Sequence, residues 1–275
     1  MKNVEGSSTR GIVHAAAGQG KFVLNRFAPG PMLEPFVEHY WSIRYHLPDG
    51  QRHTQTVLSF PNVHLAFEQD DVGRRALLYG IPKRPFVREL RGAGRVLGVK
   101  FRAGGFFPFW QQDVSLLTGT TITASAVFGS CADEWLDAIL DAGSDAAMAE
   151  QAEFALSAQL PGRDAQAELA DHIVRNTLDD RSIIRVEQMS DRTGLSVRQL
   201  QRLFRKYVGV TPKWVIKRFR LQEAAERLER DESAQWVELA VQLGYFDQAH
   251  FIKDFKSVLG QSPTAYRKAS DIRRD

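Results

Sequence analysis

Residues 194–212 read GLSVRQLQRLFRKYVGVTP, and residues 244–263 read GYFDQAHFIKDFKSVLGQSP. Both segments run from a glycine through a phenylalanine and a second glycine to a hydroxyl residue followed by proline. The corresponding pairs are Gly194 and Gly244, Phe204 and Phe255, Gly209 and Gly260, and Pro212 and Pro263. The first pair is 50 residues apart and the others 51, because the second turn holds one residue more. This pattern predicts a duplicated supersecondary unit.

The first unit has the punctuation of two short helices. Residues 186–192 are expected to form a helix that ends at Gly194, where glycine can adopt the left-handed conformation. Ser196 followed three residues later by Gln199 is a capping box that starts the next helix. An apolar stripe at helical spacing then faces a core; it consists of Leu200, Leu203, Phe204 and Tyr207.

The opposite face of that helix is basic and polar, with Arg198, Gln201, Arg202 and Arg205. A helix, a glycine turn and an exposed second helix form a helix-turn-helix, whose second helix lies in the DNA major groove. Arginine reads guanine and glutamine reads adenine through paired hydrogen bonds. The alternative is a surface helix that only solvates its charges.

The second unit repeats this arrangement. Residues 236–243 are expected to form its first helix, and Asp247 caps its second. Side chains expected to point inward are Phe251, Phe255, Val258 and Leu259; those expected to point outward are Gln248, His250, Lys253 and Lys256. Asp254 is expected to repel phosphate and to weaken DNA binding by this unit.

A connector helix is expected between the units, over residues 213–229. Thr211 is a natural N-cap, and Pro212 suits the first helical position. Seventeen residues at about 1.5 Å each give roughly 25 Å. Such a strut is suited to holding two reading helices about one DNA turn, ~34 Å, apart.

Charge is distributed unevenly along the chain. Residues 192–222 hold nine basic residues and no acidic one, although the whole chain has a formal charge of only +3. An uncompensated basic field attracts polyanions, most commonly nucleic acid. The alternative is a solvated basic helical face.

These motifs together resemble the AraC/XylS-type bacterial transcription regulators over residues 170–270. The resemblance rests on Gly194-Leu195-Ser196, Leu200-Gln201-Arg202-Leu203-Phe204, Gly209-Val210-Thr211-Pro212, the run from Gly244 to Phe251, and Gly260-Gln261-Ser262-Pro263. It implies a seven-helix DNA-binding domain. Base-reading positions carried over by motif are Arg198, Gln201 and Arg202, then Gln248, His250 and Lys253. Lys253 stands where the family usually has arginine, and lysine cannot form the bidentate fork.

The resemblance also implies partners and a cellular place. Double-stranded DNA is the expected partner, with RNA polymerase, a small-molecule effector and a second copy of the chain as further candidates. The protein is expected to be cytoplasmic, bound to the nucleoid, and to act as an activator or repressor. No cofactor, metal or membrane contact is expected.

The N-terminal part is patterned for strands. Over residues 21–111, short apolar runs alternate with Pro and Gly turns, which predicts a small antiparallel sheet or barrel. The fold class expected is α+β: a β-rich domain with a helical segment over 21–162, and an all-α domain over 166–270. Residues 1–20 are expected to be a flexible leader. In the helical segment, the residues expected to face the core include Trp135, Leu136, Ile139, Leu140, Phe154, Leu156 and Leu160.

Aromatic residues in the β-rich part are candidates for an effector pocket: Tyr40, Trp41, Phe101, Phe106 and Trp110. The alternative is that they form the core. The resemblance of this part to sensing domains rests on residues 36–41 and 97–106.

Composition excludes several other classes of protein. The chain has 275 residues, 43% hydrophobic, with one cysteine, so it can bury a core but has no disulfide framework or Cys-rich zinc site. No apolar run approaches the ~18 residues of a membrane span. An enzyme acting on DNA or a small ligand stays an alternative, with its active site expected within residues 21–111. Catalysis by a Cys131–His couple is a separate possibility. A non-specific nucleoid protein is a second alternative.

Overall fold

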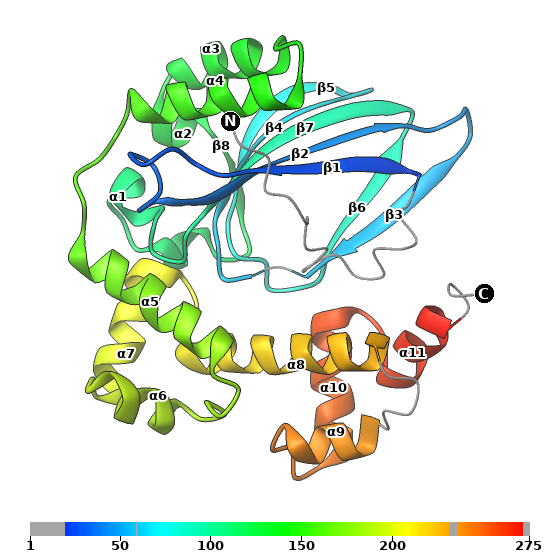
Figure 1. Cartoon of the computed structure of the whole chain (residues 1–275), viewed down its shortest axis with the longest axis vertical. Coiled ribbons are helices and arrows are strands. Elements are labelled where there is room, and N and C mark those ends of the chain that lie inside the picture. Colours follow the sequence, from blue (N-terminus) through cyan, green and yellow to red (C-terminus); the bar gives the residue numbers. More distant parts are fainter. Residues whose placement is uncertain (1–19, 59, 231–235, 272–275) are drawn as a thin grey trace.

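A computed structural model describes residues 20–58, 60–230 and 236–271. A β-rich half is followed along the chain by a wholly helical half (Figure 1). The expected α+β class, with antiparallel strands first and helical units second, is confirmed. The expected leader lies outside the described residues except for its last position.

The β-rich half contains two antiparallel sheets. The larger has the order β1-β2-β7-β4-β5-β8, formed by Phe22–Phe27, Val37–His46, Ala93–Phe101, His64–Asp70, Gly73–Tyr79 and Thr121–Thr123. The smaller pairs β3 (Arg52–Val57) with β6 (Phe86–Arg91). β8 is the shortest strand, with three residues, and β6 reads FVRELR.

Two helices, α3 (Cys131–Leu140) and α4 (Asp145–Ser157), cover one face of the larger sheet (Figure 1). The short elements α1 (Phe107–Trp110), η2 (Val114–Leu117) and α2 (Ser125–Phe128) connect the sheet to them. The expectation that Phe154 and Leu160 face the core is wrong, since they are 75% and 40% exposed. Phe154 lies about 200° round α4 from Ala152, which packs inward.

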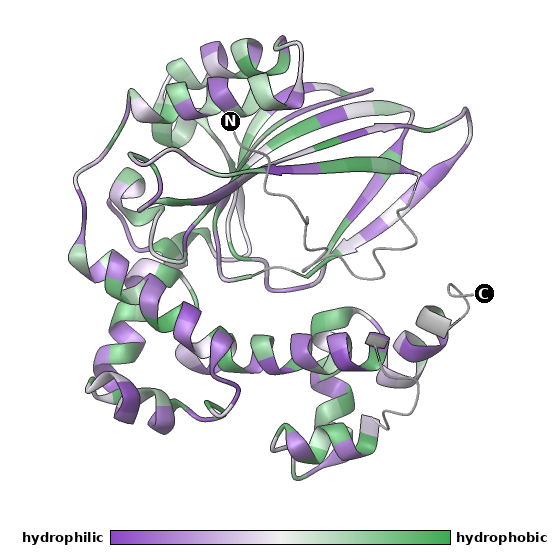
Figure 2. Ribbon diagram, viewed as in Figure 1, coloured by the Kyte–Doolittle hydropathy of each residue, from purple (hydrophilic) through white to green (hydrophobic). Residues whose placement is uncertain are grey.

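The helical half has seven α-helices among the described residues, as the resemblance implies. They are α5 (Ala165–Asp179), α6 (Val186–Thr193), α7 (Val197–Leu203), α8 (Pro212–Arg230), α9 (Trp236–Gln242), α10 (Gln248–Leu259) and α11 (Pro263–Asp271). A π-helical turn, η3 (Phe204–Val208), extends α7. Hydrophobic and hydrophilic residues alternate along these helices (Figure 2). The expected connector helix is α8. No helix within 20–58, 60–230 or 236–271 is long and apolar enough to cross a membrane.

Two hydrophobic cores hold the molecule together. One runs without a break from the sheets through α3, α4 and α5 into α7, η3 and the first half of α8. The other joins the second half of α8 to α9, α10 and α11, and includes Leu58 of the β-rich half. The first helix-turn-helix unit therefore shares its core with the β-rich half.

Candidate nucleic-acid interface

The first unit is fixed by its turn and cap as expected. Gly194 ends α6 with a φ of +68°, the left-handed conformation that glycine adopts without strain. The Ser196 hydroxyl accepts from the Gln199 amide at 3.3 Å, and the Gln199 side chain accepts from the Ser196 amide at 2.8 Å. This reciprocal capping box sets where α7 begins and which of its faces points outward.

The expected inner and outer faces of α7 are both observed. The inner stripe is buried: Leu200, Leu203, Phe204 and Tyr207. The expected DNA-reading side chains Arg198, Gln201 and Arg202 are exposed and fall within an arc of about 100°. Among the described residues, neither Arg198 nor Arg202 has an ion-pair partner, so their guanidinium groups face solvent with their charge uncompensated.

Arg205 differs from the other three. It is exposed, but its Nε lies 3.5 Å from Oδ2 of Asp113, which belongs to the β-rich half. The adjacent Lys206 places its Nζ 4.8 Å from the ring centre of Phe107, also in the β-rich half. The end of this helix is thus tied across the molecule, whereas its start is not.

The second unit has the same order of turn, cap and helix. Gly244 has a φ of +73°, and the Asp247 carboxylate accepts from the Ala249 amide at 2.9 Å to cap α10. The four expected outward side chains are all exposed: Gln248, His250, Lys253 and Lys256. The expected inward residues are buried: Phe251, Phe255, Val258 and Leu259.

Asp254 does not face the surface, contrary to expectation. It is 9% exposed, and its carboxylate accepts from Lys217 of α8 at 3.1 Å and from the Tyr245 hydroxyl at 3.3 Å. Burial, with Asp254 adding to it, raises the pKa of Tyr245, so this hydroxyl keeps its proton and donates. Asp254 therefore joins α10 to the connector helix. Its charge is neutralised by Lys217 within the unit and does not face a DNA phosphate.

The connector α8 has its expected cap and packing. The Thr211 hydroxyl accepts from the Trp214 amide at 3.2 Å, and Pro212 occupies the first helical position. Its expected packing residues are all buried: Val215, Phe219, Ala224, Ala225 and Leu228. The 19 residues of α8 extend about 28 Å, with one unit at each end (Figure 1).

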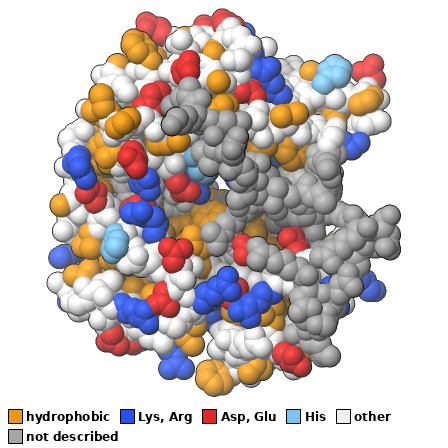
Figure 3. Space-filling model, viewed as in Figure 1, with side chains coloured by type: hydrophobic (Ala, Val, Ile, Leu, Met, Phe, Trp, Pro, Cys, Tyr) orange, Lys and Arg blue, Asp and Glu red, His pale blue; other side chains and the backbone are white. Residues whose placement is uncertain are grey.

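The basic run of residues 192–222 is not a uniform field. Arg192 pairs with Asp180, Lys217 pairs with Asp254, and Arg218 is buried, which lowers its pKa to about 10. Figure 3 accordingly shows acidic side chains interspersed with basic ones over the lower, helical half. The uncompensated charge is concentrated on the outer face of α7.

The candidate effector-pocket residues lie on different sides of the larger sheet. Phe101 and Phe106 are buried with ring centres 5.0 Å apart, and Trp110 stacks on Phe106 at 6.4 Å. Tyr40 is fully buried and donates to Glu153 of α4 at 2.9 Å. Trp41, the next residue along the strand, instead donates from its ring to His64 at 3.3 Å. Three of the five residues thus belong to the core, the half-buried Trp110 packs against it, and Trp41 is separated from them.

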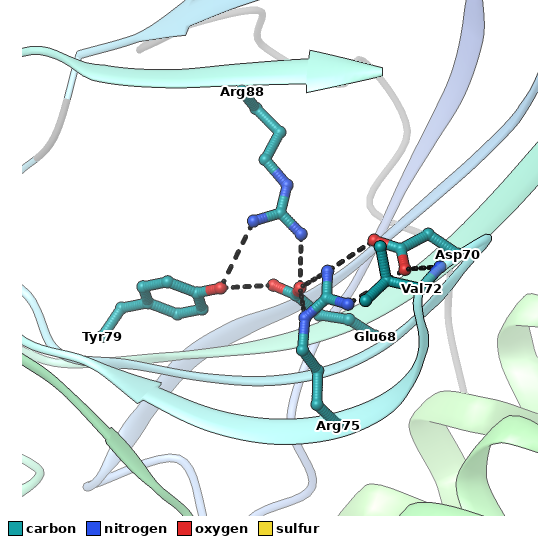
Figure 4. Close-up of polar contacts among 6 residues, drawn as sticks. All are labelled: Glu68, Asp70, Val72, Arg75, Tyr79 and Arg88. Atoms are coloured by element: carbon teal, nitrogen blue, oxygen red, sulfur yellow. Dashed lines mark hydrogen bonds and ion pairs between the residues drawn. The ribbon is translucent and has the colours of Figure 1, made fainter. Parts of the chain in front are cut away.

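Sequence reasoning missed a polar network between the two sheets (Figure 4). Glu68 of β4 is 4% exposed and accepts from the Tyr79 hydroxyl at 2.7 Å and from Arg75 at 2.8 Å. Arg88 of β6 also contacts Glu68, and Arg75 reaches on to Asp70. The network braces the smaller sheet against the larger. These residues are scattered along the chain, so no local pattern marks them.

Comparisons with known proteins match the two halves separately. A helix-turn-helix domain family matches residues 189–269, and a domain of unknown function (DUF6597) matches residues 25–123. The transcriptional activator AarP of Providencia stuartii is 35% identical over 82 residues, 30% of this chain and 60% of AarP. The probable transcription factor PqrA of Proteus vulgaris is 31% identical over 86 residues, 31% of this chain and 69% of PqrA.

Other matches cover less of their partners or are more remote. The activator RhaS of Pectobacterium carotovorum is 30% identical over 87 residues, 32% of this chain and 31% of RhaS. The chain thus covers less than two thirds of AarP and RhaS. The structure of ToxT from Vibrio cholerae aligns over 90% of this chain and 98% of ToxT, with 12% identity and a TM-score of 0.39.

The helical half consists of two capped helix-turn-helix units on one connector helix, and the named relatives that match this half are transcription factors. The chain belongs to the AraC/XylS-type family of these regulators.

Proposed function

We propose that the chain regulates transcription by binding one duplex DNA site, with α7 and α10 in two neighbouring major grooves. The observation that carries this proposal is the outer face of α7. Arg198, Gln201 and Arg202 are exposed there on a helix whose opposite face is buried and whose start is set by a capping box. Their chemistry suits base edges, and α8 has the length to separate the two helices by close to one DNA turn.

In this proposal residues 166–270 bind DNA, and residues 21–162 sense an effector or mediate dimerisation. RNA polymerase is a further partner, and the site of action is the nucleoid in the cytoplasm. The shared core and the Arg205–Asp113 ion pair support this division of roles, because they couple the two halves at η3, the π-helical extension of α7.

The proposal includes no catalytic step. The relatives that match the helical half are transcription regulators. The thiol of Cys131 donates to the Phe128 carbonyl oxygen at 2.7 Å at the start of α3. A thiol held by a backbone carbonyl is not paired with a base that would activate it.

Selection from a random DNA library by the full chain tests the proposal. One motif with two half-sites about ten base pairs apart is expected. Affinity for it should fall steeply with salt, since the contact with phosphate releases counterions. Recovery of no motif, with equal affinity for random DNA, would instead show a non-specific nucleoid protein.

A further inference from the structure

Phe246 is the most exposed of the large hydrophobic residues that the structure describes at the surface, at 96%. It lies in the turn of the second unit, directly before Asp247, the N-cap of α10. An apolar residue in that position commonly folds back onto the first turn of the helix as a hydrophobic staple. Here it does not, so its ring is left entirely to solvent.

The reason is that Phe246 is the extra residue of the second turn. In the first unit Leu195 follows Gly194 and packs against the core, and the cap Ser196 comes next. In the second unit Tyr245 takes the place of Leu195: it is 9% exposed, with its ring 5.2 Å from Phe251.

Trp236 stacks on Phe251 at 6.4 Å, so other aromatic rings already cover the place where a staple would pack. The core of the unit is therefore complete without Phe246.

Phe246 lies at the N-terminal end of α10, which is the end expected to approach the bases. In helix-turn-helix proteins the N-terminal residues of the second helix contact base edges. Gln248 and Ala249 are exposed beside it. A phenyl ring has no hydrogen-bonding group, so it cannot read donors, acceptors or phosphates. The apolar feature offered by the major groove is the C5-methyl group of thymine.

We propose that Phe246 contacts a thymine methyl group in the half-site bound by the second unit, and so supplies base specificity where Lys253 cannot make a bidentate contact. The inference rests on the proposed function, because it requires α10 to enter a major groove.

Deoxyuridine substitution tests this contact, since it removes only the methyl group. The probe is the DNA motif selected by the wild-type chain, with each thymine replaced in turn by deoxyuridine. Wild type should lose about four-fold in affinity at one thymine of the second half-site, the effect of one buried methyl-sized group. Phe246→Ala should bind the natural motif more weakly by at least that factor and lose nothing further at the same deoxyuridine.

Val241→Ala is the matched control, because Val241 is 68% exposed on α9 of the same unit. It should keep the full sensitivity to deoxyuridine. Thermal unfolding of Phe246→Ala should match wild type, since the ring packs on nothing.

The outcomes separate this inference from the proposed function. If wild type selects no motif, the DNA-binding proposal itself fails. If it selects a motif but no thymine of the second half-site is sensitive, or if Phe246→Ala stays equally sensitive, only the role of Phe246 is overturned. If Phe246→Ala binds DNA as wild type does but no longer supports transcription by RNA polymerase, Phe246 contacts a protein instead. That result would also overturn the inference.

Discussion

The hydroxyl of Thr118 donates a hydrogen bond of 2.6 Å to the carbonyl oxygen of Gly209. Thr118 follows η2 in the β-rich half, and Gly209 ends the long second helix of the first unit with a φ of +87°. Phe107 of the β-rich half also packs on Tyr207 of the first unit, with ring centres 4.5 Å apart. The β-rich half therefore contacts the C-terminal end of the first unit's second helix. This is the helix that we propose reads DNA.

Thr118→Val should destabilise this junction. Valine preserves the shape but leaves the Gly209 carbonyl oxygen without the donor of this part-buried bond, and one lost hydrogen bond costs about 0.5–1.5 kcal/mol. The free energy of unfolding in urea should fall by that amount. Thr121→Val, on an exposed position of the edge strand β8, should leave it unchanged. Equal stability of both variants would show that the bond contributes nothing.

Asp113→Asn should strengthen DNA binding. The change removes the ion-pair partner of Arg205 and frees this guanidinium to reach a phosphate. Exposed ion pairs contribute about 0.2–1 kcal/mol, so affinity should rise by a factor between about 1.4 and about 5 in a fluorescence anisotropy titration.

Asp133→Asn is the control for this change, because it removes the same charge from an exposed position on α3. A gain of equal size in both variants would mean that net charge, and not the release of Arg205, accounts for it.

Stability should fall on acidification because of two histidines. Burial, with the charge of Lys100 adding to it, lowers the pKa of His39 and of His64 from 6.5 to about 3. The unfolded chain therefore takes up protons that the folded chain does not. Below a pH of about 6.5 the free energy of unfolding should drop by about 1.4 kcal/mol per pH unit for each histidine, until about pH 3.

Urea titrations between about pH 7 and pH 5 measure this slope. His64→Gln removes one of the two contributions and should make the slope shallower. His172→Gln, at an exposed position of α5, should not change it. A slope in the His64 variant as steep as in wild type would contradict the assignment.

Local pattern was sufficient for the two helix-turn-helix units. Gly194, Ser196 and Gln199 lie within six residues of one another, and the stripe from Leu200 to Tyr207 follows from helical period alone. The features that the local pattern did not predict depend on tertiary contacts. Asp254 finds Lys217 on another helix, 37 residues away, and its neighbours in sequence do not reveal that partner.

The β-rich half was less predictable for the same reason. The brace around Glu68 joins residues of β4, β5 and β6 that meet only when the two sheets pack. Phe154 was expected to be buried because it is hydrophobic. It is exposed because it does not lie on the face of α4 that packs against the sheet. The contact of η2 with the end of the first unit's second helix is likewise invisible in sequence.

Arg202→Ala tests the central claim most directly, with affinity measured for the selected DNA motif and for each single-base variant of its first half-site. Loss of one bidentate contact should cost about 1–3 kcal/mol on the natural motif and abolish the preference at one base pair. Arg163→Ala removes an exposed arginine that precedes α5 and should alter neither. An Arg202→Ala protein that bound the motif as tightly and as selectively as wild type would contradict the account.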